Sequence, residues 1–532
     1  MIALVIFCTA CGNGHGPGED GGTDEVDGVE GVDGADMADI EADDRAEDPA
    51  GEEEEAPPPT RCVIDSIEYD DGTVNPTHPC RICRLSESSL AWTGFNEGAA
   101  CAPGKVCTGG SCASGCWIDS TFYPAEAQDP LDDSHVCLPS ISGTEWTDRV
   151  VIAASDSTSE WIAIAAEVCT GTNDELVMGA HLTSGTMVEL APGTFSIAGY
   201  LAPEARTRLH GQGDGTVLNF ISGTILVRAD ALELDHFRMT GTLGDPVPVA
   251  ISISSQTEDL SDIRIHDVNA DVAGGNVFEI YANAHDTPNR TLTNITFARC
   301  SALDPDGFGF IVGGEGTTPK VENLTFFQCS VRNAGVADTR TNIWVTGIDF
   351  VEYAGMTLDK MQAIGCSVDG AWESDYHFED APTKTDCVIT DCDARNAGRK
   401  TGGAVYGAGF LLTSGDVVFS HNTGSGNANG DLRVWDPVEG HYDDYSPPID
   451  IIIPLDSTKV AARIDQGNMS GLEITDGSRK TLVLFSSDGN PVSQEIELGG
   501  LFASDDGDVY VFTGTRVLAE FPDYAVMRLI ER

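Results

Sequence analysis

The chain of 532 residues is poor in basic residues, because 29 Lys and Arg stand against 86 Asp and Glu, a formal net charge of −57. Such a field repels phosphate, which excludes nucleic acid as a partner. It also disfavours polyanionic glycans unless Ca²⁺ or a local basic patch intervenes, so Ca²⁺ is the one cofactor we consider. Aromatic residues make up only 7%, and beyond the first residues no apolar run is long enough to span a membrane.

The N-terminus is a short apolar run that no basic segment precedes. Residues 2–10 lead into Cys8-Thr9-Ala10-Cys11. Small residues before a cysteine resemble a bacterial lipobox, with Cys8 standing where leucine is usual. We therefore assign 1–11 to a lipoprotein-type signal with lipidation at Cys11, which would be the chain's one membrane attachment. A plain secretory signal and a non-functional N-terminus stay open as alternatives.

Residues 12–60 lack the apolar surface that a folded core needs. They contain many Asp and Glu, one basic residue (Arg45), few aromatics and a closing Pro57-Pro58-Pro59. Because nothing offsets the entropy of ordering, the segment is predicted to be a disordered acidic linker. Repulsion between its charges should keep it extended, as a spacer between a membrane and the next domain.

Residues 61–147 are dense in cysteine. The eight cysteines are Cys62, Cys80, Cys83, Cys101, Cys107, Cys112, Cys116 and Cys137. An even count at this density in an exported chain predicts a small disulfide-stapled module. Zinc is the alternative, because Cys80-x-x-Cys83 has the spacing of metal ligands.

This cysteine-rich module contains an internal repeat at an offset of 54 residues. Cys62-Val63-Ile64-Asp65-Ser66 returns as Cys116-Trp117-Ile118-Asp119-Ser120, whereas Ser134 stands where the second copy would match Cys80. The module resembles the cysteine-rich repeats of large bacterial surface proteins. That resemblance implies adhesion or spacing and identifies no site.

Residues 148–435 show a period of about thirty residues. Copies of the pattern apolar, x, apolar, x, x, core residue begin at 232, 263, 295, 324, 361, 387 and 417. A period of this size predicts a solenoid, and the alternation predicts strands. Four successive copies place a cysteine at the core position, and we expect buried free thiols there; they are Cys300, Cys329, Cys366 and Cys392. Asp304, Asn333 and Asn396 follow at a common offset and are predicted to serve a turn.

The start of this region carries a series of motifs. Thr170-Gly171-Thr172-Asn173-Asp174 precedes a predicted helix over 175–182, and Gly185-Thr186-Met187 and Pro192-Gly193-Thr194-Phe195 follow. The series resembles the N-terminal signature of the pectate-lyase-like superfamily, which implies an all-β chain with a right-handed parallel β-helix. Members of this fold differ widely in chemistry, so the resemblance implies no particular reaction. The catalytic motifs of polygalacturonases and alginate epimerases are absent.

A candidate site lies on the outward face of a second strand in each rung. Aligning 278–281, 308–311, 348–351, 376–379, 408–411 and 432–435 gives two outward columns. The first column contains Glu279, Gly309, Asp349, His377, Gly409 and Arg433. The second column contains Tyr281, Ile311, Val351, Glu379, Leu411 and Trp435.

Asp349 and His377 are predicted to be neighbours on adjacent rungs, with Glu379 two residues along. A carboxylate beside an imidazole suits general acid or base work, so these three are our catalytic candidates. In enzymes of the resembling fold the substrate commonly lies along such a face, and four further residues are predicted to bind it: Glu279, Tyr281, Arg433 and Trp435. An ordinary polar surface with one ion pair is the competing interpretation.

Residues 436–532 contain short β-like runs and are predicted to form a C-terminal β cap or small β domain. The whole chain is predicted to be a monomeric extracellular surface protein, lipid-anchored and disulfide-bonded, that binds and processes a polysaccharide as a lyase or glycoside hydrolase. Two alternatives stay open, namely a non-enzymatic glycan-binding or adhesive surface lipoprotein and a purely structural envelope component.

Overall fold

The computed structural model describes the chain from residue 60 to residue 436 except for 65–66, 77, 103, 245–248, 256–257, 284–289, 316–318, 336–343, 351–355, 379–382, 386, 401–402, 404–405, 413–416 and 421. Beyond residue 436 it describes strands, largely as backbone. The signal segment with Cys11 and nearly all of the acidic linker lie outside these residues. Among the described residues, no helix is both long and apolar enough to cross a membrane.

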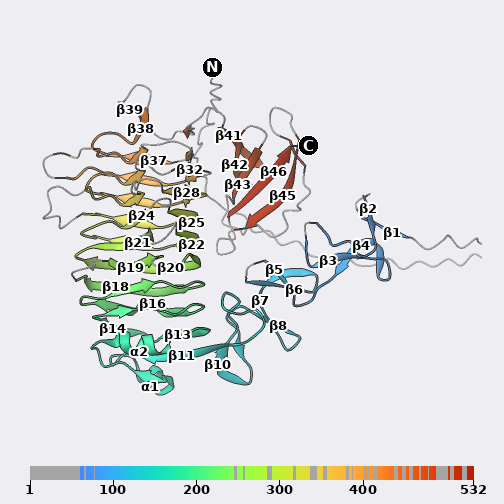
Figure 1. Cartoon of the computed structure of the whole chain (residues 1–532), viewed down its shortest axis with the longest axis horizontal. Coiled ribbons are helices and arrows are strands. Elements are labelled where there is room, and N and C mark those ends of the chain that lie inside the picture. Colours follow the sequence, from blue (N-terminus) through green and yellow to red (C-terminus); the bar gives the residue numbers. More distant parts are fainter. Residues whose placement is uncertain are drawn as a thin grey trace, which may run out of the picture. The chain divides into compact units, whose positions relative to one another are not determined.

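The predicted all-β fold with a right-handed parallel β-helix is confirmed, because strands stack rung upon rung in parallel pairs (Figure 1). The rungs have three faces. The first face contains β11 (Thr147–Ala153), β13 (Thr186–Leu190), the first parts of β16 (Arg208–Phe220), β18 (Glu233–Thr242) and β20 (Leu260–Ala273), then β22 (Thr291–Ala298), β25 (Lys320–Phe327), β29 (Gln362–Ile364), β33 (Cys387–Thr390) and β36 (Val417–Ser420). Short strands β12 (Glu167–Val168), β28 (Thr357–Asp359) and β32 (Thr383–Thr385) extend it.

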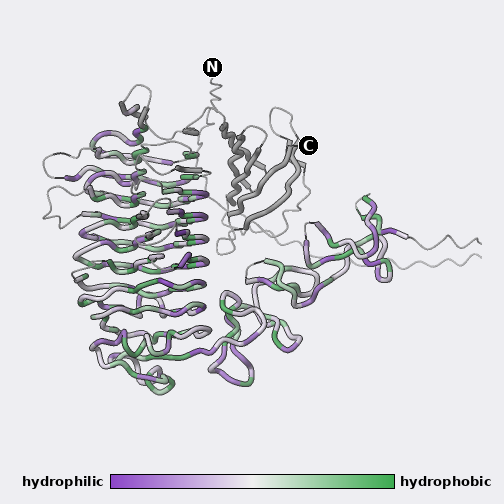
Figure 2. Tube along the Cα trace, viewed as in Figure 1, coloured by the Kyte–Doolittle hydropathy of each residue, from purple (hydrophilic) through white to green (hydrophobic). Residues whose placement is uncertain are grey.

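The other two faces are built in the same way. The second face contains β14 (Gly193–Ile197), the last parts of β16, β18 and β20, then β23 (Ser301–Leu303), β26 (Ser330–Arg332), β30 (Ser367–Asp369), β34 (Asp393–Arg395) and β37 (Thr423–Ser425). The third face contains β15 (Tyr200–Leu201), β17 (Thr224–Val227), β19 (Val249–Ser254), β21 (Asn276–Asn283), β24 (Phe310–Glu315), β27 (Ile348–Phe350), β31 (Tyr376–Phe378), β35 (Phe410–Leu412) and β38 (Leu432–Asp436). Figure 2 shows hydrophobic and hydrophilic residues alternating along the rungs, as expected for strands that bury one face.

The core of the solenoid consists of stacked columns of identical or similar side chains. The four cysteines predicted at the core position are buried and free of disulfides, as expected: Cys300, Cys329, Cys366 and Cys392. Burial raises the pKa of the Cys329 and Cys392 thiols, which keeps them protonated. Asn422 takes the same position on the next rung, where its side chain accepts a hydrogen bond from the Cys392 N–H (2.8 Å) and donates one to the Ile389 carbonyl (2.9 Å).

The corners of the rungs use residues with left-handed backbone conformation. Asp304, Asn333 and Asn396 have φ of 49°, 57° and 58° and form the predicted turn column. Asn333 Nδ2 donates to Asp304 Oδ1 at 2.7 Å, so the side chains also link successive rungs. Asn and Asp tolerate this conformation better than other non-glycine residues, which explains their recurrence. A second such corner separates the first face from the second and contains His236 and Asp267 (φ 57° and 54°).

The start of the solenoid carries two short helices, α1 (Ser159–Ile164) and α2 (Asp174–His181), the second where the sequence predicts one. Asp174 is buried, and its carboxylate accepts hydrogen bonds from the backbone N–H groups of Gly171, Thr172 and Ser196 at 2.8 to 3.1 Å. The Gly-Thr-x-Asp turn therefore fastens α2 to strand β14.

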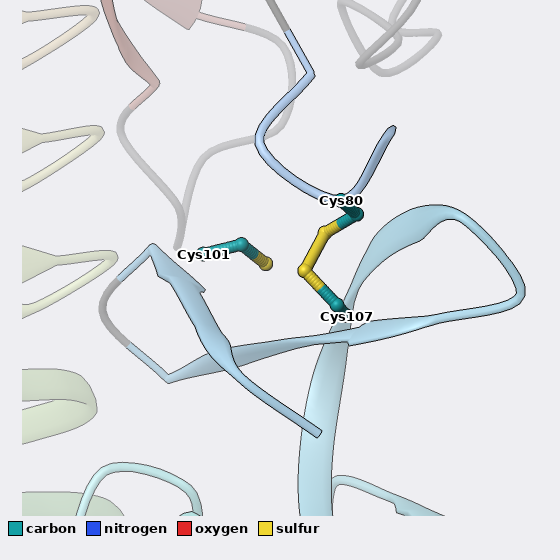
Figure 3. Close-up of side chains that lie close together, drawn as sticks. All are labelled: Cys80, Cys101 and Cys107. Carbon is teal, nitrogen blue, oxygen red and sulfur yellow. A yellow bond between two sulfur atoms is a disulfide. The ribbon is translucent and has the colours of Figure 1, made fainter. Parts of the chain in front are cut away.

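All eight cysteines of the cysteine-rich module form disulfides, which pair Cys62–Cys83, Cys80–Cys107, Cys101–Cys112 and Cys116–Cys137. Figure 3 shows the Cys80–Cys107 bond with the Cys101 side chain close to it. Cys80 and Cys83 thus belong to different disulfides, and the zinc alternative is wrong. The strands of this module are β1 (Arg61–Ile64), β2 (Ile67–Asp70), β3 (Arg81–Arg84), β4 (Ser88–Gly94), β5 (Ala100–Ala102), β6 (Lys105–Thr108), β7 (Ser111–Ile118), β8 (Thr121–Pro124), β9 (Gln128–Asp129) and β10 (Asp132–Val136).

The internal repeat of the cysteine-rich module is visible in its geometry. The bonds Cys62–Cys83 and Cys116–Cys137 both close 21 residues. Beside each bond a tyrosine and a tryptophan pack with ring centroids 4.6 Å apart and an interplanar angle of 55°, Tyr69 with Trp92 and Tyr123 with Trp146. Each copy is therefore a small two-part core of one disulfide and one aromatic pair.

Beyond residue 436 the structure describes a further series of β-strands. These are β39 (His441–Tyr445), β40 (Ile451–Ile453), β41 (Lys459–Gln466), β42 (Met469–Asp476), β43 (Arg479–Ser486), β44 (Leu501–Ala503), β45 (Val509–Val517) and β46 (Tyr524–Glu531). Strands β39 and β40 pair antiparallel with β38 and β36, the last strands of the third and first faces. Strands β41–β46 form one antiparallel sheet.

Candidate functional site

The third face brings Asp349 and His377 together as predicted. Asp349 on β27 pairs in register with His377 on β31, and His377 Nδ1 lies 3.5 Å from Asp349 Oδ1. Both side chains are nearly inaccessible, with 2% and 5% of their surface exposed, although the sequence predicted an outward, accessible pair. A catalytic role for either residue stays a prediction. Because both side chains are nearly inaccessible, such a role requires that the residues covering them move.

Tyr406 lies beside the imidazole of this pair, and its ring is also close to two further aromatic rings. Its ring centroid lies 5.6 Å from that of His377, 4.9 Å from that of Trp344 and 6.0 Å from that of Tyr442. Trp344, Tyr406 and Tyr442 are called the aromatic strip below. Trp344 is 42% exposed, and the other two side chains are partly exposed.

Charged residues hold the aromatic strip in place. The buried Glu373 accepts a hydrogen bond from Lys400 Nζ (2.9 Å) and another from the Tyr406 backbone N–H (3.2 Å). Lys400 Nζ also lies 5.6 Å from the Trp344 ring centroid, within range of a cation–π contact. A single buried carboxylate therefore positions two parts of the strip.

Arg433, a predicted substrate-binding residue, belongs to the same site. Its guanidinium lies 5.0 Å from the Tyr442 ring centroid, and Nη1 donates to the Tyr406 carbonyl at 3.3 Å. Glu379 and the side chain of Trp435 lie outside the described residues. The site thus combines Asp349, His377 and Arg433 with aromatic residues that the sequence analysis missed.

Glu279 and Tyr281 do not join this group. Glu279 on β21 is separated from Asp349 by Ile311 on the intervening strand β24. Burial raises the pKa of Glu279, whose carboxylate accepts a hydrogen bond from Ser252 Oγ at 3.1 Å. Tyr281 pairs with Gly313 on β24.

The predicted register of two rungs was wrong by two residues. Phe278 pairs with Phe310, and Tyr376 with Phe410, so Ile311 and Leu411 occupy the outward column in place of Gly309 and Gly409. A shift of two leaves every residue on its own side of the sheet, so alternation alone does not detect it. Both glycines instead lie just before their strands, where a Cβ would come within 2.6 Å of Val331 or Asn427 side-chain atoms.

A second cluster of titratable side chains, which the sequence analysis missed, lies at the corner between the first and second faces. His210, Asp235 and His266 are register neighbours on β16, β18 and β20. The ring of His236 lies between those of His210 and His266, with centroids 5.2 and 5.4 Å away. These residues, with Arg208, Glu233 and Asp267, are called the histidine cluster below.

Asp235 is the centre of the histidine cluster, and its side chain is fully buried. Arg208 donates two hydrogen bonds to the Asp235 carboxylate, from Nε to Oδ1 (2.9 Å) and from Nη2 to Oδ2 (2.7 Å). Burial alone would raise the pKa of Asp235, but hydrogen bonds with Arg208, His210 and His236 hold it well below its ordinary value. The hydrogen bond to Asp235 in turn raises the pKa of His236.

His266 is held by carboxylates on both sides. Nδ1 lies 2.8 Å from Asp267 Oδ2, and Nε2 lies 3.0 Å from Glu233 Oε1. Burial lowers the pKa of His266, yet the two hydrogen bonds outweigh it and raise the pKa to about 9. Burial by itself would raise the pKa of Glu233. The hydrogen bond with His266 and the charge of Arg208 outweigh burial and lower the pKa of Glu233 to about 2. His266 therefore donates from both nitrogens as an imidazolium.

A small hollow adjoins the cluster and is lined by Arg264, Ile265, His266, Thr296, Ala298 and Arg299. Arg299 pairs with Asp267 through two hydrogen bonds of 2.7 Å, from Nε and Nη2. The sequence held a signal for this region. The two adjacent variable positions before the core residue are Asp235-His236 in one copy of the thirty-residue pattern and His266-Asp267 in the next, so both copies pair a histidine with an aspartate there.

A signal for the aromatic strip was also present. Trp344 and Tyr406 each lie four residues before the start of a third-face strand, β27 or β35. An aromatic residue at one offset on two rungs indicates a shared position on the surface. Tyr442 lies on β39 and shows no such pattern.

No family model and no curated protein sequence matches the chain. Similar solved structures include ORF18 of Geobacillus virus E2 (10% identity, 61% of this chain and 76% of that one, TM-score 0.24). Tailspike gp49 of Acinetobacter baumannii bacteriophage Fri1, a capsular polysaccharide depolymerase, is 11% identical over 80% of this chain and 91% of its own, with a TM-score of 0.27. Pectate lyase Pel9A is 13% identical over 52% and 79%, with a TM-score of 0.20. At identities of 10–13% and TM-scores of 0.20–0.27, these similarities assign no role to this chain.

Proposed function

We propose that this chain is an extracellular β-helix protein that binds a polysaccharide on its third face, across the aromatic strip. The carrying observation is the row of Trp344, Tyr406 and Tyr442, whose neighbouring ring centroids lie 4.9 and 6.0 Å apart on a partly exposed surface. The C–H face of a sugar ring packs well on an aromatic ring, whose broad apolar surface contributes more than its area alone would suggest.

Polar groups beside the strip support a sugar ligand. Arg433 and Lys400 contact the rings of Tyr442 and Trp344, so cationic N–H donors lie beside the stacking surface. Saccharide sites combine apolar contact with a few fixed polar groups, and this combination is present here. The four disulfides favour an oxidising location, in keeping with an extracellular polysaccharide as partner. Lipid anchoring through Cys11 remains part of the proposal.

Affinity electrophoresis of the full-length protein through gels that contain neutral or acidic polysaccharides tests the proposal. Tyr406→Ala should weaken retention by about tenfold or more, and Trp344→Ala should also weaken it, because central aromatic anchors dominate binding energy. Tyr200→Ala is the matched control, since Tyr200 is a 57% exposed tyrosine at the opposite end of the third face. No retention on any polysaccharide, or equal retention of wild type and Tyr406→Ala, would contradict the proposal.

Cleavage of the bound polysaccharide, as a lyase or glycoside hydrolase, is the second candidate function. The Asp349–His377 pair beside Tyr406 favours it, because a carboxylate next to an imidazole is equipped for proton transfer. New reducing ends released from a polysaccharide that the gel retains would support it. His377→Ala should then abolish release and leave retention intact, and a retained polysaccharide that is never cleaved would identify a binder.

A further inference from the structure

Three nitrogen atoms converge on one oxygen atom of the histidine cluster. Asp235 Oδ2 lies 2.7 Å from Arg208 Nη2, 2.8 Å from His210 Nδ1 and 2.6 Å from His236 Nδ1. A carboxylate has about four lone-pair sites over its two oxygens, so one oxygen accepts two strong hydrogen bonds in good geometry. With three nitrogens at this distance, at least one imidazole nitrogen is in excess of the donors that Oδ2 accepts in good geometry.

Arg208 is the one of these three groups that can act only as a hydrogen-bond donor. A guanidinium only donates, and Arg208 also lies with Nη2 3.3 Å from His210 Nδ1. His210 Nδ1 is therefore placed between an obligate donor and a carboxylate oxygen. An imidazole nitrogen without its proton carries a lone pair and can bind a cation. A cation bound there would attract both His210 Nδ1 and Asp235 Oδ2, and it would account for the close approach of these two atoms.

We propose that His210 Nδ1, His236 Nδ1 and Asp235 Oδ2 bind a divalent metal ion that prefers nitrogen ligands, with Zn²⁺ as the representative. The ligand atoms lie within 4.8 Å of one another, as the ligand atoms of a metal site must. This inference is independent of polysaccharide binding and concerns a different face of the solenoid.

The choice of ion follows from the ligands. Two imidazoles and one carboxylate suit Zn²⁺ and its neighbours in the first transition row, whereas Ca²⁺ takes oxygen ligands almost exclusively. Three protein ligands leave a tetrahedral ion one open position for water or substrate. Arg208 would remain on the other carboxylate oxygen through its 2.9 Å contact from Nε, and so orient Asp235 as a positioning residue.

Accessibility is compatible with ion entry. The side chain of Asp235 is fully buried, whereas those of His210 and His236 are 20% and 42% exposed. An ion can thus reach the site from the surface while its anionic ligand stays shielded from water. Shielding strengthens the attraction between a carboxylate and a cation.

A neighbouring group of His236, His266 and Asp267 also has converging ligand atoms. Both nitrogens of His266 are already engaged, at 2.8 Å by Asp267 and at 3.0 Å by Glu233. Asp267 Oδ2 lies 2.8 Å from His266 Nδ1 but 3.8 Å from His236 Nε2, and Arg299 donates to both oxygens of Asp267. The possible ligand atoms of this group therefore converge less closely than the three around Asp235 Oδ2. The group centred on Asp235 is therefore the one we assign.

Isothermal titration of the chelator-treated full-length protein with Zn²⁺ tests the assignment. The wild type should show one saturable site that His210→Gln and His236→Gln each weaken by about 100-fold or more, because even outer-shell changes cost about 10–100-fold. Binding of Co²⁺ should give visible absorption bands that the same variants lack. Millimolar Ca²⁺ should not compete.

His181→Gln is the matched control, since the His181 side chain on α2 is 28% exposed and its Nε2 lies 3.7 Å from Oε1 of the exposed Glu167. It should bind Zn²⁺ as the wild type does. The double variant His210→Gln/His236→Gln gives the background from the acidic residues and thiols. If His236→Gln fails to fold, as judged by circular dichroism, His210→Gln decides alone.

Three results would overturn the assignment. The first is a wild type with no saturable site above the background of the double variant. The second is unchanged affinity in both single variants. The third is loss of binding in His266→Gln with full binding in His210→Gln, which would place the ion one rung further along.

Discussion

Two of the groups in which the protein places imidazoles beside carboxylates have very different surroundings. On the third face, Asp349 and His377 lie 3.5 Å apart, nearly inaccessible, with the Tyr406 ring beside the imidazole. At the corner of the first face, Asp235 is contacted by Arg208 and two imidazoles at 2.6 to 2.9 Å, and one of those imidazoles, His236, is 42% exposed.

This difference shows that residue types alone do not assign a role. The same two residue types lie beside an aromatic ring in one place and take part in a crowded charge network in the other. A buried pair whose Nδ1 and Oδ1 atoms lie 3.5 Å apart suits support of the neighbouring aromatic strip. Short contacts with partial exposure suit binding of an ion or exchange of a proton.

The largest expected effect comes from removing the arginine of the histidine cluster. Arg208→Met should lower the free energy of unfolding by about 3–5 kcal/mol, because it leaves buried carboxylates without their main counter-charge. The Arg208 side chain is only 4% exposed. The shift of the urea unfolding midpoint, followed by circular dichroism, measures the loss.

Arg238→Met is the control for this substitution. Arg238 and Asp271 form a 3.1 Å ion pair on the second face with 42% and 47% of their side chains exposed. Exposed pairs contribute about 0.2–1 kcal/mol, so the control should change stability little. Equal effects of the two substitutions would remove the distinction between the cluster and an ordinary surface pair.

The fold was predictable because the sequence shows two periods, one of two residues along each strand and one of about thirty residues along the chain. Alternation identified strands, and a repeat of about thirty residues identified rungs, including the column of Cys300, Cys329, Cys366 and Cys392. The adjacency of Asp349 and His377 followed from the same pattern and is confirmed by strand pairing.

The rest of the candidate site was harder to predict for physical reasons. Alternation is unchanged by a shift of two, so the rungs of Phe310 and Phe410 were aligned wrongly. Trp344 and Tyr406 lie between strands, where no period constrains them. Whether an outward residue is covered depends on such segments, and for this reason the burial of Asp349 and His377 was not foreseen.

A smaller effect is expected at the carboxylate that positions the aromatic strip. Glu373→Gln removes the partner of Lys400, whose side chain is 12% exposed, and should cost about 1–3 kcal/mol. Because Glu373 also holds the Tyr406 backbone, glycan retention should weaken too, though less than in Tyr406→Ala. Loss of stability with unchanged retention would show that the strip does not depend on this contact.

An effect of opposite sign is expected at Asp375, which precedes β31 and is fully buried. Burial raises its pKa well above the ordinary value, only partly offset by the hydrogen bond from the Ala371 N–H. The folded state therefore keeps the proton to higher pH than the unfolded state, whose pKa is about 3.9. The stability this group contributes is complete below that pH and is lost as pH rises.

Asp375→Asn retains the hydrogen-bond acceptor and carries no charge. It should match the wild type near pH 4 and unfold at a higher urea concentration at pH 7 to 8. Thermal or urea unfolding of both proteins across this pH range measures the difference. A variant that is less stable than the wild type at every pH would contradict the raised pKa.

The smallest effect is expected at the rim of the histidine cluster. Arg299 binds Asp267 through two hydrogen bonds, yet the two side chains are 43% and 25% exposed. Arg299→Ala should therefore cost only about 0.2–1 kcal/mol, and the difference should fade at about 1 M salt, where exposed charges are screened. A loss as large as that of Arg208→Met would mean that the rim and the centre of the cluster act as one unit, and the metal site would then have to include Asp267.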